Sequence, residues 1–136
     1  MQSLPFEFPL DKIHNFKDAR LVSYLSDADR PGLKVGAVIH KGNKKLAFGC
    51  NSYSKTHTIQ NENCKKYLHA EISALIKRRH YEDITSCSMT VYREVNNGTP
   101  ALTIPCQYCQ KILKKHGIKK VYYSKPEAPY FDVLIL

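Results

Sequence analysis

The chain has 136 residues, of which 43% are hydrophobic and 24% charged, and its net charge is +9 with histidines counted as neutral. This length fits one globular domain, which we expect to cover residues 1–136, and the composition excludes a disordered chain. No apolar run approaches the roughly 20 residues that a membrane span needs, and the first residues lack the basic and apolar segments of a signal peptide. We therefore expect a cytoplasmic protein that does not associate with membranes.

The cysteine count and the charge limit the partners. Five cysteines are an odd number, and only Cys106 and Cys109 are closely spaced. A reducing compartment and a metal site explain this pattern better than a disulfide framework does. The positive charge attracts phosphates on a nucleotide or along a nucleic acid, but a basic solvated surface is an equally good reading. The charge alone therefore identifies no ligand.

The first half of the chain predicts one helix, a hairpin and a loop. Apolar residues near one face predict a helix over residues 11–30, which Pro31-Gly32 would end. Apolar runs at 35–39 and 46–49 enclose a short polar stretch, so they predict a β-hairpin. Residues 51–66 are polar and predict a long loop, and long ordered loops often carry function.

The second half alternates helices and strands. A helix is predicted from Leu68 to His80, with Leu68, Ile72 and Leu75 on its apolar face. The further expected elements are a strand at 87–92, a turn at 96–98, a helix after Pro105 that ends near Gly117, and strands at 118–123 and 130–136. The alternation predicts an α/β fold, a three-layer α/β/α sandwich around one mixed sheet of about five strands.

Potential metal ligands gather at two predicted helix starts. His69 lies at one start, and Cys106 and Cys109 are three residues apart at the other, so both sulfurs lie on one side of the first turn. The exposed N–H groups and the positive dipole end there favour thiolates. Two thiolates and one neutral imidazole leave one position of a tetrahedral zinc open for water. One Zn²⁺ ion per chain is therefore predicted. A fourth protein ligand would close the open position, so the other cysteines are expected to be ordinary thiols: Cys50, Cys64 and Cys87.

Glu71 is the candidate catalytic residue, because it lies two positions after His69. A carboxylate there can take a proton from the attacking water and return it to a ring nitrogen and to leaving ammonia. This cycle needs a raised pKa, which a dry pocket would supply. The alternative is a carboxylate that only stabilises a helix N-terminus. Water attack on an amidine-like carbon is the reaction that the arrangement suits.

The motif His-x-Glu followed by Pro-Cys-x-x-Cys is the signature of zinc deaminases, and residues 35–123 resemble the cytidine deaminase-like superfamily. The best likeness is to the deoxycytidylate deaminase branch, since residues 105–112 are similar to its PCxxCxKxI motif and residues 117–123 to its GIxxVxY motif. Ser73 departs from that branch, which often has Asn there. The resemblance implies a sheet flanked by helices and usually a homo-oligomer.

The resemblance also implies deamination of a cytosine nucleotide or nucleoside, most simply dCMP to dUMP. The alternative is a deaminase of cytosine or adenine in single-stranded DNA or RNA, which the charge favours and the motif details do not. A structural zinc module that binds nucleic acid is a third possibility. Glu71 argues against it, because a structural site needs four protein ligands and no proton shuttle.

Five residues are candidates for substrate contacts. The resemblance assigns Asn51 a contact with the sugar, although an ordinary turn residue is the alternative. Lys55 and His57, in the polar loop, are candidates for binding a phosphate. Tyr108, between the two cysteines, either forms a wall of the base pocket or only packs. Ala70, between His69 and Glu71, completes the expected set.

Overall fold

The computed structural model describes residue 8 and residues 10–55, 67–78 and 83–136. Its helices are α1 (Leu10–Ser23), the short 3₁₀ helix η1 (Pro31–Leu33), α2 (Ala70–Lys77) and α3 (Gln107–Lys115). Its strands are β1 (Val35–Lys41), β2 (Lys44–Cys50), β3 (Ser88–Arg93), β4 (Lys120–Ser124) and β5 (Phe131–Ile135). None of the described helices is long and apolar enough to cross a membrane.

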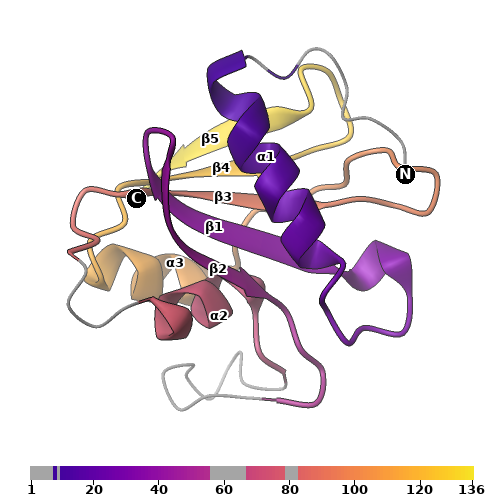
Figure 1. The fold of residues 1–136 in the computed structure, drawn as a ribbon, viewed down its shortest axis with the longest axis horizontal. Coiled ribbons are helices and arrows are strands. Elements are labelled where there is room, and N and C mark those ends of the chain that lie inside the picture. The colour runs from indigo at the N-terminus through magenta and orange to yellow at the C-terminus, as the bar shows by residue number, and fades with distance from the viewer. Residues whose placement is uncertain (1–7, 9, 56–66, 79–82) are drawn as a thin grey trace.

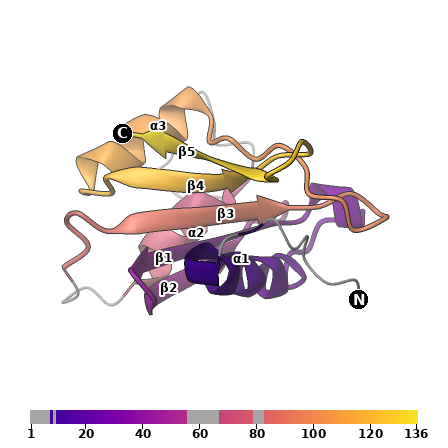
Figure 2. The same ribbon diagram turned by 90° about the horizontal axis from the view of Figure 1, so that it is seen from above.

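The five strands form one mixed sheet in the order β2-β1-β3-β4-β5. β3 and β4 run parallel, and the other neighbouring pairs run antiparallel. Helix α1 crosses one face of the sheet, and α2 and α3 cover the other (Figures 1 and 2). The predicted α/β/α sandwich with about five strands is confirmed.

Two cores lie on the two faces of the sheet. Ala37 and Ile39 of β1 belong to the cluster under α2 and α3, whereas Val38 belongs to the cluster under α1. Because successive side chains of a strand point to opposite faces, a strand that is covered on both sides is apolar without interruption. This explains the continuous apolar run at 35–39. The α1 side is rich in aromatic rings, with Phe16 and Tyr92 in edge contact at 6.4 Å between centroids.

Two glycines let the helices approach the sheet closely. A Cβ atom at Gly36 would lie 1.9 Å from the carbonyl oxygen of Ala19 in α1. A Cβ atom at Gly49 would lie 2.2 Å from the backbone nitrogen of Ala74 in α2. Since α2 begins beside His69, Gly49 determines how close that helix and its first residues lie to β2.

Gly49→Ala is therefore expected to destabilise the fold by about 1–3 kcal/mol, because the new methyl group meets backbone atoms that cannot turn away. Urea denaturation would measure the change. Gly32→Ala is the matched control, since a Cβ atom there meets nothing within 4 Å. Equal unfolding midpoints for the two variants would contradict the close approach of α2.

The first helix is shorter than predicted, and the prediction of a helix over 11–30 was wrong beyond Ser23. The prediction rested on apolar residues near one face, and two of these, Leu21 and Leu25, are 54% and 76% exposed in the structure. After the helix the chain turns, and the Asp27 carboxylate accepts hydrogen bonds from residues 52–54 at 2.6 to 3.3 Å. These bonds lower the pKa of Asp27 and fix the chain that follows β2.

The other predicted elements are confirmed with small shifts of their ends. Gly42 and Asn43 form the turn of the β1–β2 hairpin, with Gly42 at φ +62°. Gly117 follows α3 with φ +93°, as expected of a glycine at a helix C-terminus. Helix α2 ends at Lys77, and the Arg78 guanidinium donates to the carbonyl oxygen of Leu75 at 2.6 Å. Most of the predicted loop at 51–66 lies outside the described residues.

Candidate active site

The candidate metal ligands are held at the N-termini of α2 and α3. His69 is the N-cap residue of α2 and has extended backbone angles. Cys106 is the N-cap residue of α3, and its sulfur accepts the backbone N–H of Cys109 at 3.5 Å. Two backbone hydrogen bonds of 2.9 Å between Ser52 and Leu68 fix the segment that precedes His69. Each ligand thus comes from a position that secondary structure determines.

The side chains of His69, Cys106 and Cys109 come together as predicted. Their potential ligand atoms all lie within 4.8 Å of one another, and His69 Nδ1 is 3.4 Å from Cys109 Sγ. Zinc bonds of about 2.3 Å to sulfur and about 2.0 Å to nitrogen require comparable separations. The donor set fits a zinc ion with one open position. In the part of the chain that the structure describes, no other such group of histidine, cysteine and acidic residues occurs.

The electrostatics of this group suit metal binding and proton transfer. Hydrogen bonds with Cys109 and His69 lower the pKa of the Cys106 thiol to about 4, so the thiolate is its stable form. Glu71 is only 6% exposed, and burial raises the pKa of its carboxyl group. A nearby thiolate at Cys106 acts in the same direction, while the charge of His69 opposes it. A proton is therefore retained on Glu71 nearer to neutral pH than on an ordinary glutamate.

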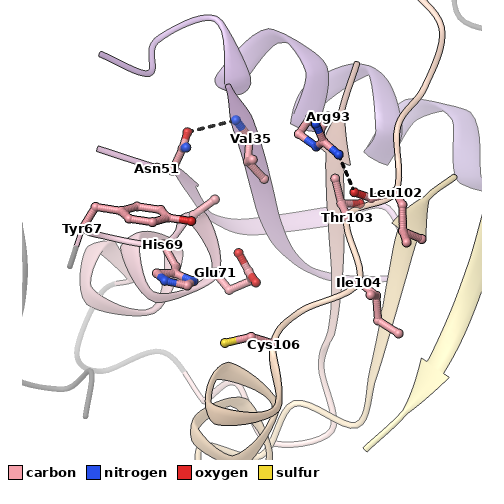
Figure 3. Close-up of a pocket in the computed structure, with 11 residues that line it drawn as sticks. Val35, Asn51, Tyr67, His69, Glu71, Arg93, Leu102, Thr103, Ile104 and Cys106 are labelled. Carbon is pink, nitrogen blue, oxygen red and sulfur yellow. Dashed lines mark hydrogen bonds between the residues drawn. The ribbon is translucent and has the colours of Figure 1, made fainter. Parts of the chain in front are cut away.

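A pocket of about 210 Å³ opens beside the ligands. Figure 3 shows His69, Glu71 and Cys106 at one end of it and Arg93 at the other. The lining residues are Val35, Asn51, Tyr67, His69, Ala70, Glu71, Arg93, Leu102, Thr103, Ile104 and Cys106. His69, Cys106 and Glu71 therefore face a cavity that a small molecule can enter.

The predicted substrate contacts are distributed unevenly around this pocket. Asn51 and Ala70 line it. Asn51 is also a structural residue, since its Oδ1 accepts from Val35 N at 2.9 Å and its Nδ2 donates to Leu33 O at 2.8 Å. Tyr108 is half-buried and Lys55 is exposed, and neither is among the lining residues. His57 lies outside the described residues.

Sequence reasoning missed several lining residues, of which Tyr67 and Arg93 matter most for the chemistry. Tyr67 stacks on the imidazole of His69, with centroids 4.7 Å apart and planes at 8°, and its other ring neighbour is Tyr53 at 4.5 Å. Arg93, at the end of β3, donates to the carbonyl oxygens of Gly32 at 2.8 Å and Leu102 at 3.0 Å. For Tyr67, its position two residues before His69 was the one feature of the sequence that could have placed it in the pocket. No local pattern marks Arg93.

A family model described as the cytidine and deoxycytidylate deaminase zinc-binding region matches residues 13–125. The chain belongs to this deaminase family. Its members are hydrolases that act on C–N bonds, and the zinc-binding region of this deaminase contains the group of His69, Cys106 and Cys109. The family resemblance and the zinc dependence predicted from the sequence are thus confirmed.

Solved structures agree with this assignment. The dCMP deaminase from the cyanophage S-TIM5 in apo form is 30% identical, with a TM-score of 0.63, over 86% of this chain and 84% of that one. The same enzyme in complex with dCMP and dUMP is 32% identical, with a TM-score of 0.63, over 86% and 82%. Cytidine deaminase from Burkholderia pseudomallei shares the fold at 17% identity, with a TM-score of 0.59 and 90% of each chain covered. No curated protein sequence matched this deaminase.

Proposed function

We propose that this chain is a single deaminase domain that hydrolyses dCMP to dUMP with release of ammonia. The observation that carries the proposal is the pocket with two unlike ends. Glu71 and the metal ligands lie at one end, and the Arg93 guanidinium lies at the other. A nucleotide has matching ends, namely an amino-pyrimidine and a phosphate. The similarity to a phage enzyme that was crystallised with dCMP and dUMP supports the same choice.

The chemistry follows from the residues at the first end. We propose that His69, Cys106 and Cys109 hold one zinc ion, which when bound supplies the Lewis acid that makes water nucleophilic near neutral pH. Glu71 takes a proton from the attacking water and delivers it to the ring nitrogen. It then transfers the second proton to the amino group, so that the C–N bond breaks and ammonia leaves as the new C–O bond becomes a carbonyl. Tyr67, stacked on His69, holds the imidazole plane in place.

We propose Arg93 as the phosphate contact in place of Lys55, which does not line the pocket, whereas His57 lies outside the described residues. Among the described residues that line the pocket, Arg93 is the only lysine or arginine. A guanidinium has five N–H donors, and two of its nitrogens each donate to a carbonyl oxygen here. The remaining donors are available to a phosphate, and the two carbonyl contacts hold the guanidinium in one orientation.

Arg93→Gln is expected to lower kcat/KM for dCMP by about 10- to 100-fold, because a charge-assisted hydrogen bond to the phosphate is worth about 1.5–3 kcal/mol. The value for deoxycytidine, which lacks the phosphate, should change much less. Steady-state kinetics on both substrates would measure the ratio, which does not depend on the fraction of active protein. Arg93→Lys, which keeps the charge, should retain part of the preference. An equal loss on both substrates would show that Arg93 only supports the fold.

The net charge of +9 favours a second candidate, a deaminase of single-stranded nucleic acid. Such an enzyme contacts several phosphates, so its binding should fall with a log–log salt slope of about −0.7 per phosphate. Part of the charge has another explanation. Arg78, in the Lys77-Arg78-Arg79 run, donates a hydrogen bond to the Leu75 carbonyl oxygen at the end of α2. If the substrate is a free nucleotide, Lys77, Arg78 and Arg79 are expected to be dispensable, and steady-state turnover of dCMP by their alanine variants would measure this.

A further inference from the structure

A second pocket lies at the opposite end of the sheet, on the α1 side. His40 of β1 pairs in register with Ser88 of β3, and Ser88 pairs with Lys120 of β4, so the three side chains form one row across adjacent strands. His40 is 3% and Ser88 7% exposed. Val35 lines the first pocket and His40 the second, and five positions along β1 correspond to about 17 Å. The two pockets are therefore separate.

Positive charge converges on this row. Lys12 of α1 and Lys120 hold their ammonium groups 4.7 Å and 5.7 Å from the centroid of the Tyr122 ring. Lys119 also lines the pocket, whose volume is about 290 Å³. One lining carboxylate opposes them, since Asp11 lies 3.2 Å from the Lys12 ammonium. Two ammonium groups near one ring give the pocket a positive potential, which favours a bound anion.

The same pocket contains a buried acceptor that lacks a donor. Asn15 is 2% exposed, and its Nδ2 lies 3.4 Å from Gly42 O and 3.5 Å from His40 Nδ1. Its Oδ1 is the one buried side-chain polar atom among the described residues that has no hydrogen-bond partner. Buried acceptors are nearly always satisfied, so this oxygen needs a donor that the described part of the chain does not supply, such as a water molecule or a ligand hydroxyl.

We propose that this pocket binds a phosphorylated small molecule that also carries a hydroxyl group, such as a sugar phosphate or a nucleotide. The phosphate lies between Lys12 and Lys120 and accepts a hydrogen bond from the Ser88 hydroxyl. The hydroxyl of the ligand donates to Asn15 Oδ1. The site accounts for part of the basic charge that the active-site pocket does not use, and it does not depend on the proposed dCMP substrate.

The test is an NMR titration of the full chain with ribose 5-phosphate, inorganic phosphate and a single-stranded oligonucleotide, following the signals of His40 and Ser88. Ribose 5-phosphate should shift these signals saturably and bind several-fold more tightly than inorganic phosphate, which lacks the carbon-bound hydroxyls. Lys12→Ala and Lys120→Ala should each weaken binding by about tenfold, as loss of a hydrogen bond to a charged group does. Lys17→Ala, on the exposed side of the same helix, is the control and should change affinity less than about twofold.

Asn15→Ala should remove the preference for ribose 5-phosphate over inorganic phosphate. Should an alanine variant fail to fold, Lys120→Gln and Lys12→Gln keep the length of the side chains and serve in its place. Unshifted His40 and Ser88 signals at millimolar ribose 5-phosphate would overturn the proposal, and so would equal weakening in the Lys17 control. Tighter binding of the oligonucleotide, with a steep salt dependence, would replace the small-molecule site by a polynucleotide surface.

Discussion

Glu71→Gln is expected to retain zinc and to lose deamination activity by at least about 10²–10⁴-fold, because the amide cannot cycle a proton. The loss should not come from unfolding. Burial raises the pKa of the Glu71 carboxyl, so the charged form is costly here and a neutral amide of the same shape is tolerated. Steady-state turnover of dCMP together with zinc stoichiometry would measure the effect.

The exposed Glu127 provides the matched control, since Glu127→Gln makes the same chemical change far along the chain from the pocket. That variant should retain normal turnover. Full activity in Glu71→Gln would show that another group moves the proton. Loss of zinc along with activity would instead make Glu71 a part of the metal site.

Cys109→Ser is expected to lower zinc affinity by more than about 100-fold and to lower the unfolding temperature at the same time. Outer-shell partners alone change metal affinity by about 10- to 100-fold, and a direct ligand should matter more. Stability should follow metal binding, because the site forms only in the folded chain. Metal analysis and thermal unfolding, with and without added zinc, would measure both effects.

Cys87→Ser is the control for this change, because Cys87 and Cys109 are both fully buried and Cys87 is not in the metal group. Both substitutions place a hydroxyl in a buried position, but the Cys87 variant should retain its zinc. Its unfolding temperature should respond to added zinc as that of the unchanged chain does. Normal zinc content in Cys109→Ser would place the ligands elsewhere.

The metal group was predictable because its geometry is local. The three-residue spacing of Cys106 and Cys109 and the place of His69 at a helix start determine where these atoms lie once the helices form. Both N-cap positions are observed. That the N-termini of the two helices lie together was predicted from the motif. No interaction between the two segments could be recognised in the sequence.

The remaining pocket residues depend on contacts between distant segments. Arg93 faces the pocket because it bonds to Gly32 and Leu102, which no periodicity connects to it. The end of α1 was predicted wrongly for the same reason, namely contacts between distant segments. After this helix the Asp27 carboxylate accepts hydrogen bonds from residues 52–54, which lie far away in the sequence. Asn51 was predicted from the sequence as a sugar contact, but its structural role was not. Its side chain accepts a hydrogen bond from Val35 N and so fixes the start of β1.

The central proposal is tested most directly by the release of ammonia and dUMP from dCMP by the zinc-loaded chain. We expect the two products in equal amounts, at a rate that exceeds the rates with deoxycytidine and with a cytosine-containing single-stranded oligonucleotide. The Glu71→Gln variant should produce neither. Ammonia from the oligonucleotide with none from dCMP would contradict the proposal and identify a nucleic-acid deaminase.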